Sequence, residues 1–128
     1  MSKIFNNYGA LGVDRNKSNS MVDAIVELIT SHNEDLHIMI SPEGTRKLTN
    51  RWKTGFYYAA LKAKIPLVLS SLDYSKKLAH IGPAFMPTGC FKRDMITVKE
   101  YYSKPVPKYP DNFILQIYET DDNAICAG

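Results

Sequence analysis

The sequence predicts an α/β fold: a layered domain with a largely parallel sheet, a mixed sheet being the alternative, and helices on the faces of that sheet. Two observations predict it. Apolar runs typical of strands alternate along the chain with segments of helical periodicity, and this alternation favours parallel strands joined by helices. The length of 128 residues suits one unit with its own core, so we expect a single domain over residues 1–128.

Three elements are expected before residue 41. Residues 8–13 form a short apolar run with two glycines, which we expect to be a strand. A helix is expected over about residues 20–31, capped by Ser18 or Ser20. Its apolar residues fall at i, i+3, i+4 and i+7, namely Val22, Ile25, Val26 and Ile29. The apolar run 36–40 is expected to be the next strand.

Four further segments follow. A second helix is expected from Thr54 to about Lys64, with an inward face of Phe56, Ala59, Ala60 and Ala63. The run 67–72 is apolar almost throughout, which favours a strand covered on both faces. Residues 79–86 are expected to form another strand. The last clear helix is expected over 92–102, with Met95, Val98 and Tyr102 on one face. For residues 112–118 both a helix and a strand stay open.

The charge of the chain is modest and unevenly distributed. The formal net charge is +3, which is too small to indicate nucleic acid, and the pattern of a recognition helix is absent. Residues 41–55, however, contain four cationic side chains and one carboxylate. Positive charge is therefore concentrated around one short segment, and we expect no nucleic-acid partner.

Localisation is predicted from cysteines and hydropathy. Cys90 and Cys126 are expected to be free thiols in a reducing cytoplasm. No apolar run reaches the roughly 18 residues that span a bilayer, and the first residues do not resemble a secretory leader. A cytoplasmic protein is therefore expected. Aromatic residues beside lysines, around Trp52 and Tyr57, leave peripheral contact with the inner face of the membrane as an open alternative.

The most specific motif is Ser41-Pro42-Glu43-Gly44-Thr45-Arg46, directly after the expected strand 36–40. Arg46 suits bidentate pairing with phosphate oxygens, and Thr45 and the peptide groups around Gly44 add neutral donors. The alternative is that Glu43 and Arg46 form an ion pair that fixes the loop. Both can hold at once, with Glu43 orienting Arg46.

A second arginine is expected at the same place. Asp14-Arg15 follows the first expected strand, and ligands gather at the carboxyl edge of parallel strands. Arg15 and Arg46 would then converge, with Lys53 nearby, around a dianion. The alternative is that Arg15 pairs with Asp14 or with a loop carboxylate.

These residues carry a family resemblance. Gly9-Ala10-Leu11-Gly12-Val13-Asp14-Arg15, the Pro-Glu-Gly-Thr-Arg motif of residues 42–46, and Ile65-Pro66-Leu67-Val68-Leu69 appear in that order. Lys53-Thr54-Gly55 also fits. Over roughly residues 8–103 the chain resembles the lysophosphatidate (1-acyl-glycerol-3-phosphate) acyltransferases, and residues 104–128 read as a C-terminal extension. One departure is Ser70, where the family usually has proline.

The resemblance implies a fold, an activity and a set of site residues. It implies an α/β domain that transfers an acyl group from acyl-CoA or acyl-carrier protein to a 1-acyl-glycerol-3-phosphate-type acceptor in phospholipid synthesis. No other cofactor and no metal is implied. The acceptor phosphate would be bound by Arg15, Glu43, Gly44, Thr45, Arg46 and Lys53. The pocket for the acyl chain would be lined by Ile65, Pro66 and Leu67.

One block of the family is missing. Its catalytic base is a histidine followed five positions later by an aspartate. In this sequence the histidines His32, His37 and His80 are followed at that distance by His37, Pro42 and Phe85. We therefore assign no catalytic residue, and Cys90 has no base paired with it in sequence.

The missing block decides what is expected of the chain as a whole. We expect an N-terminally truncated domain that is inactive by itself. The alternative is a non-catalytic remnant that binds phosphate or anionic lipid and self-associates as a homo-oligomer through exposed core.

Overall fold

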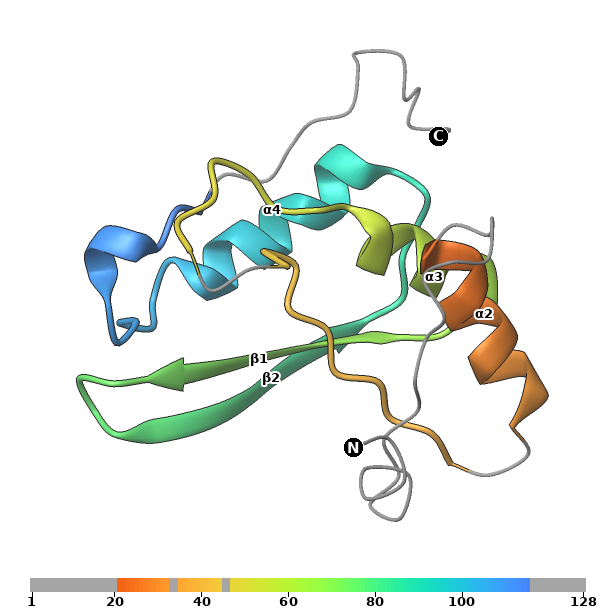
Figure 1. The fold of residues 1–128 in the computed structure, drawn as a ribbon, viewed down its shortest axis with the longest axis horizontal. Coiled ribbons are helices and arrows are strands. Elements are labelled where there is room, and N and C mark those ends of the chain that lie inside the picture. Colours follow the sequence, from red (N-terminus) through yellow and green to blue (C-terminus); the bar gives the residue numbers. More distant parts are fainter. Residues whose placement is uncertain (1–20, 33–34, 45–46, 116–128) are drawn as a thin grey trace.

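The computed structural model describes residues 21–32, 35–44 and 47–115 and shows a small α+β fold (Figure 1). The elements in chain order are α2 (Met21–Ser31), α3 (Gly55–Ala63), β1 (Leu67–Asp73), β2 (Leu78–Phe85), α4 (Phe91–Tyr102) and the 3-10 helix η1 (Pro110–Asn112). Within these residues the sheet has two strands, β1 and β2, which are antiparallel. The prediction of a layered domain with a largely parallel sheet is therefore wrong.

A tight hairpin turn accounts for the antiparallel pairing. Only residues 74–77 separate β1 from β2, whereas parallel strands need a crossover of a dozen or more residues. Asp73 accepts hydrogen bonds from the backbone N–H groups of Ser75 (3.0 Å) and Lys76 (3.2 Å) and from Ser75 Oγ (2.6 Å). Lys77 closes the turn in the left-handed region, at φ 54°.

The expected strand 36–40 has no place in this sheet. Residues 35–40 have no helical or strand assignment, and Met39 is 92% exposed. Ile38 and Ile40 are exposed too. An apolar run with strand character becomes a strand only where a partner pairs with its backbone. The other expected strand, 8–13, lies outside the described residues.

The helices follow their predicted positions. Ile25 on the apolar face of α2 is buried, as are Ala59 and Ala60 of α3 and Met95 and Val98 of α4. For residues 112–118 a helix and a strand were both left open, and their described part, residues 112–115, forms neither. Only the end of η1 and the irregular residues 113–115 are found there.

Helix α2 packs against α3 at the right of Figure 1. The Lys62 ammonium of α3 pairs with the Asp23 carboxylate of α2 across 2.6 Å. At Gly55, a Cβ atom would lie 3.7 Å from Val22 Cγ2, an ordinary van der Waals distance, so the first turns of the two helices lie next to each other.

Helix α3 ends in a left-handed cap. Lys64 lies at φ 56° and ψ 45°. Its N–H donates to the Leu61 carbonyl (3.3 Å), and the Ile65 N–H donates to the Ala60 carbonyl (3.1 Å). This is the Schellman arrangement. Pro66 follows and prevents the helix from continuing, which leads the chain directly into β1.

The core is rich in aromatic side chains and lies between α3, the inner face of the hairpin and α4. Its buried members are Trp52, Tyr57, Leu69, Phe91, Met95 and Val98. Edge-to-face ring contacts join Trp52 to Tyr102 (5.2 Å between centroids) and Tyr57 to Phe91 (5.1 Å). Such contacts add to the burial of apolar area. The full burial of Tyr57 was not expected from helical spacing.

A buried polar network joins α3 to the start of α4. Asp94 accepts hydrogen bonds from Tyr57 Oη (2.7 Å), the Thr88 N–H (2.8 Å) and Thr88 Oγ1 (2.9 Å). The Gly89 N–H donates to Tyr57 Oη (3.1 Å). Burial, followed by the bond to Asp94, raises the pKa of Tyr57. The network satisfies every polar group it buries, so it ties the two helices together without an orphaned charge.

The prediction of a free thiol at Cys90 is wrong. Cys90 is buried directly before α4 and is disulfide-bonded. Cys126, the other predicted free thiol, lies outside the described residues.

Candidate functional site

The predicted phosphate-binding motif begins with a tight turn. The Gly44 N–H donates to the Ser41 carbonyl (3.1 Å), and Pro42 and Glu43 occupy the two middle positions. Proline suits the second position of such a turn. Gly44 has φ +66°, a conformation that side-chain-bearing residues rarely adopt. Backbone geometry therefore favours glycine at this position.

Lys53 packs directly on this turn. Its N–H donates to the Pro42 carbonyl (2.8 Å). A Cβ atom on Gly44 would lie 3.2 Å from both Cε and Nζ of Lys53. The lysine ammonium thus occupies the space that the glycine leaves empty, which places a cation against the peptide of Gly44. Gly44 and Lys53, which were both predicted to bind phosphate, therefore lie against each other.

Glu43 has a different environment from the cations around it. It is half-buried, and burial raises its pKa. Loss of hydration disfavours the charged form of a carboxylate. Arg51 and Lys53 add two cationic side chains to the same segment of the sequence, where cations outnumber this carboxylate.

The N-terminus of α3 lies next to Lys53. Thr54 precedes the helix, as predicted, but its side chain makes no capping hydrogen bond. The Tyr57 and Tyr58 N–H groups donate to the Thr54 carbonyl. The first amides of a helix, here those of Gly55 and Phe56, have no acceptor in a preceding turn and carry partial positive charge. The N-terminus of α3 therefore presents hydrogen-bond donors that suit an anion.

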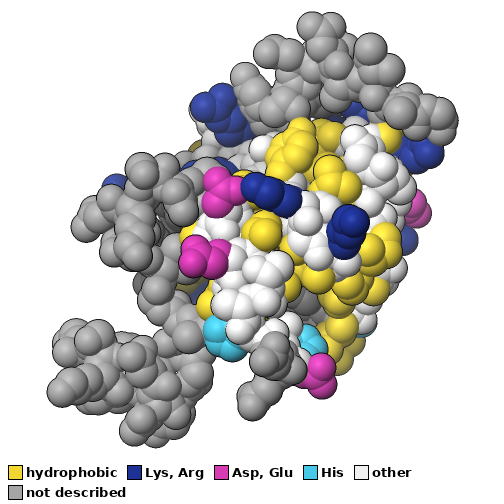
Figure 2. Space-filling view, turned by 90° about the vertical axis from the view of Figure 1, so that its right-hand side faces the viewer, with side chains coloured by type: hydrophobic (Ala, Val, Ile, Leu, Met, Phe, Trp, Pro, Cys, Tyr) yellow, Lys and Arg dark blue, Asp and Glu magenta, His cyan; other side chains and the backbone are white. Residues whose placement is uncertain are grey.

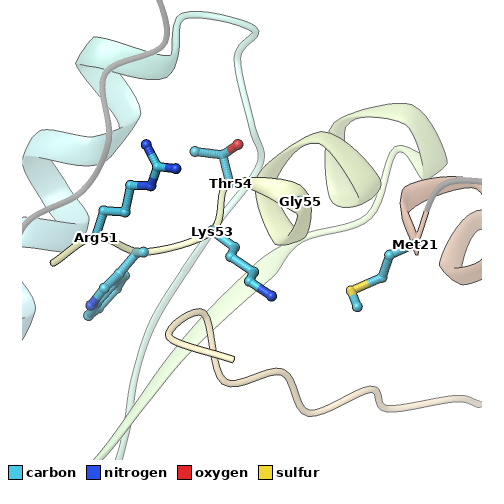
Figure 3. A pocket seen from close by; sticks show the side chains of 6 residues that line it. Met21, Arg51, Lys53, Thr54 and Gly55 are labelled. Atoms are coloured by element: carbon cyan, nitrogen blue, oxygen red, sulfur yellow. The ribbon is translucent and has the colours of Figure 1, made fainter. Parts of the chain in front are cut away.

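An open pocket of about 520 Å³ lies at this point. It is lined by residues from α2, from the segment before α3 and from α3 itself: Met21, Arg51, Trp52, Lys53, Thr54 and Gly55. In Figure 3 the Arg51 and Thr54 side chains lie on one side of the segment 51–54. Lys53 lies on the other side and is directed toward Met21 of α2. The two cations therefore approach a ligand from different sides and do not form a joint clamp.

Trp52 anchors this segment to the core. It is 3% exposed and contacts Tyr102 of α4. Its indole Nε1 is buried without a hydrogen-bond partner in the described structure. A buried aromatic ring between Arg51 and Lys53 restricts the backbone, so both cations extend from a rigid base.

The predicted site residues are only partly brought together. Glu43, Gly44 and Lys53 lie side by side, while Arg15, Thr45 and Arg46 lie outside the described residues, so the convergence of the two arginines stays a prediction. The predicted acyl-pocket residues Ile65, Pro66 and Leu67 lie at the opposite end of α3 from this pocket, in its connection to β1. Leu67 packs against the core, Ile65 is half-buried and Pro66 is exposed.

Sequence reasoning missed part of the pocket lining. Met21, Arg51, Thr54 and Gly55 line it but were not assigned to a site. A signal for three of them was present, because Arg51 belongs to the basic segment 41–55 and Thr54-Gly55 belongs to the Lys-Thr-Gly step of the resemblance. Met21 comes from α2, and no local pattern indicates that its helix packs here.

The surface around α2 and α3 is mixed in charge. Figure 2 shows this side of the molecule, where hydrophobic side chains are interspersed with Lys, Arg, Asp and Glu. No group of three or more His, Cys, Asp or Glu side chains in the described part of the chain could hold a metal ion. The histidines described lie away from the pocket lining, and His32 Nδ1 is within 2.8 Å of the Leu28 carbonyl of its own helix.

Comparisons with known proteins add no assignment. No protein-family model, no curated protein and no solved structure matches this chain. Among the described helices, none is long and apolar enough to cross a bilayer. The case for a function therefore depends on the residues and geometry of the site.

Proposed function

We propose that this chain binds a phosphate monoester at the pocket formed by the Ser41–Gly44 turn, Lys53 and the N-terminus of α3. The observation that carries the proposal is the place of the Lys53 ammonium, 3.2 Å from where a Cβ atom on Gly44 would lie. A cation held against a turn, next to uncapped helix amides, offers both charge and directional donors to phosphate oxygens.

The resemblance in sequence suggests which phosphate monoester. The turn belongs to the Pro-Glu-Gly-Thr-Arg motif, so we propose an acceptor of the 1-acyl-glycerol-3-phosphate type, as in phospholipid synthesis. In that role Arg15, Thr45 and Arg46 would complete the binding of the phosphate, and Ile65, Pro66 and Leu67 would contact the acyl side. The acyl donor would be an acyl thioester of coenzyme A or of acyl-carrier protein, and peripheral membrane contact would give access to the lipid.

The proposal assigns binding, not proton transfer, to these residues. Deprotonation of the acceptor hydroxyl requires a general base, and the 128 residues contain no histidine with an aspartate five positions later. We therefore propose that the chain alone binds the acceptor with negligible acyl transfer. The second candidate is a non-catalytic module that binds phosphate or anionic lipid. Robust turnover in a thioester-release assay with lysophosphatidate would contradict both the expected inactivity of the chain and the non-catalytic module.

Titration of glycerol 3-phosphate, followed by calorimetry, tests the binding. Lys53→Ala is expected to weaken affinity about tenfold or more, since a charge-assisted hydrogen bond contributes about 1.5–3 kcal/mol. Lys104→Ala is the matched control, because Lys104 is exposed and pairs with Glu100 of its own region (3.8 Å), away from the pocket lining. Equal affinity of the Lys53 variant, the control and the unchanged chain would remove the site.

Two further variants distinguish the contribution of the Gly44 turn to binding from that of Arg46. Gly44→Ala is expected to displace the Lys53 side chain and to weaken binding in part, because the added Cβ would approach its Nζ to 3.2 Å. Arg46→Ala tests the sequence prediction directly. Full affinity in Arg46→Ala together with a loss in Lys53→Ala would confine the site to the turn and α3.

A further inference from the structure

The turn of the hairpin lies beside the segment that joins α4 to η1, and both are at the left of Figure 1. The Tyr74 N–H of the turn donates to the Val106 carbonyl of the segment (2.8 Å). The Lys108 ammonium lies 6.0 Å from the ring centroid of Tyr74 and 5.2 Å from that of Tyr109. We give the name hairpin tip to six exposed side chains of the turn and the segment, namely Tyr74, Lys76, Lys77, Val106, Lys108 and Tyr109.

The hairpin tip combines exposed apolar surface with positive charge. Its two tyrosines and its valine are between 42% and 61% exposed, and its three lysines are exposed too. At the surface of a bilayer, tyrosine rings lie at the level of the headgroups. The ammonium groups of lysines stay in water there, while their alkyl stems contact apolar surface. This combination of side chains suits that boundary.

The exposed charge at this end of the molecule is positive. Asp73, the carboxylate of the turn, is 3% exposed and accepts the hydrogen bonds of the turn, with the Lys76 ammonium 3.7 Å away. Glu100 pairs with Lys104 (3.8 Å), and Asp111 lies in η1. The three lysines of the hairpin tip therefore outnumber the exposed carboxylates near them, and an anionic partner is complementary in charge.

We propose that the hairpin tip contacts the surface of an anionic phospholipid bilayer. A single-stranded nucleic acid would use the lysines and the rings, but it would leave the aliphatic side chain of Val106 in water. The acyl boundary of a bilayer buries that side chain as well, which is favourable.

The proposal locates the peripheral membrane contact named above and in this respect rests on the proposed function. It uses none of the residues that line the phosphate pocket, and the hairpin tip lies at the opposite end of the molecule from α2 (Figure 1). Trp52 and Tyr57, around which the sequence placed such contact, are 3% and 0% exposed. They are part of the core, so the hairpin tip takes their place at the bilayer.

Cosedimentation of the full chain with vesicles of phosphatidylcholine, alone or mixed with phosphatidylglycerol, tests the proposal. The unchanged chain is expected to bind the anionic vesicles and to be released by salt. Lys77→Gln combined with Lys108→Gln is expected to weaken binding about twentyfold, because each lysine at an anionic surface contributes a factor of about five to affinity. Lys92→Gln combined with Arg93→Gln is the matched control, since it removes the same charge at the other end of α4; it is expected to bind like the unchanged chain.

A second pair of variants tests the apolar part of the contact. Tyr109→Ser is expected to weaken binding to anionic vesicles about fivefold or more, because less apolar surface leaves water. The salt dependence of binding is expected to stay the same, since no charge changes. Ile96→Ser is the matched control, because Ile96 of α4 is 65% exposed and does not belong to the hairpin tip.

No binding to anionic vesicles, or an equal loss of affinity in the tip variants and their controls, would overturn the proposal. Binding of single-stranded DNA instead of vesicles, weakened by the same tip variants, would overturn it too and would assign the hairpin tip to nucleic acid. Circular dichroism shows whether each variant is folded. Glycerol 3-phosphate affinity is expected to be unchanged in the tip variants, so failure of the hairpin tip and failure of the phosphate site are distinguishable.

Discussion

Two regions of this molecule are built on different principles. The region from α3 through the hairpin to α4 encloses an aromatic core in which Met95 is 2% exposed. The described residues of the segment 35–50, which carries the specific motif, are mostly exposed, and Met39 is 92% exposed. One link between this segment and the residues before α3 is the hydrogen bond from the Lys53 N–H to the Pro42 carbonyl. Stability and the candidate site thus depend on different residues, and Trp52 and Lys53 link them.

The two methionines give the strongest test of this comparison. Met95→Ala is expected to lower the free energy of unfolding by about 2–4 kcal/mol, because it leaves a cavity among packed side chains. Met39→Ala is expected to change it by less than about 0.5 kcal/mol. Chemical denaturation of both variants measures the difference. Similar effects would mean that the segment 35–50 is packed as tightly as the core.

The buried phenol of Tyr57 tests the core by pH. Tyr57→Phe is expected to cost about 1–2 kcal/mol at neutral pH, since Asp94 and the Gly89 N–H both lose a hydrogen-bond partner. Burial in the folded state raises the pKa of Tyr57 above its ordinary value of 10.0. The neutral form of the phenol therefore stabilises the folded state relative to the unfolded state. That contribution is present below about pH 10 and is lost as the pH rises through the higher folded value.

The variant is the control for this pH dependence. Unfolding curves at increasing alkaline pH should show a smaller loss of stability in Tyr57→Phe than in the unchanged chain. Tyr102, whose pKa is also raised by burial, contributes equally to both proteins. Identical alkaline profiles would contradict the assigned role of the Tyr57 hydroxyl.

A smaller effect of opposite sign is expected where α3 ends. Lys64→Gly is expected to stabilise the chain by about 0.5–1 kcal/mol, because a left-handed conformation is less strained for glycine. Lys99→Gly, in α4, should instead cost about 1 kcal/mol. Thermal unfolding of the pair shows whether the boundary between α3 and β1 depends on this backbone geometry. Destabilisation by both glycines would exclude the left-handed cap in solution.

The smallest expected effect is the difference between two carboxylates, Asp73 and Glu43, in how their contributions to stability depend on pH. Hydrogen bonds, first that from the Ser75 hydroxyl, lower the pKa of Asp73, whereas burial raises the pKa of Glu43. The Asp73 contribution is present above its ordinary value of 3.8 and is lost as the pH falls through the folded pKa. The Glu43 contribution is present below 4.5 and is lost as the pH rises through the folded pKa.

Acidification therefore separates the two turns. Between about pH 7 and about pH 3, Asp73→Asn is expected to make the loss of stability shallower, and Glu43→Gln is expected to make it steeper. Urea unfolding across this range measures both slopes. A shift in the same direction for both variants would show that the motif turn and the hairpin turn have similar electrostatic surroundings.

Much of the local structure could be predicted from the residues. The spacing of Ile25 and Val98 with their neighbours located α2 and α4, and Pro66 marked the start of β1. The apolar run 36–40 could not be interpreted in the same way, because strand pairing depends on a partner far along the chain. For the site, Glu43, Gly44 and Lys53 were predicted, while Met21 was not, because its place in the pocket results from the packing of α2 on α3.

The order of residues by itself determined where each helix forms, which side chains are available for the core, and which short segment concentrates cations around a glycine turn. These properties follow from periodicity and backbone preferences over a few neighbours. Tertiary structure alone decided that the run 36–40 is unpaired and that the packing of α2 on α3 brings Met21 to the pocket. Each of these depends on contacts between residues distant in sequence, whose free energies no local pattern contains.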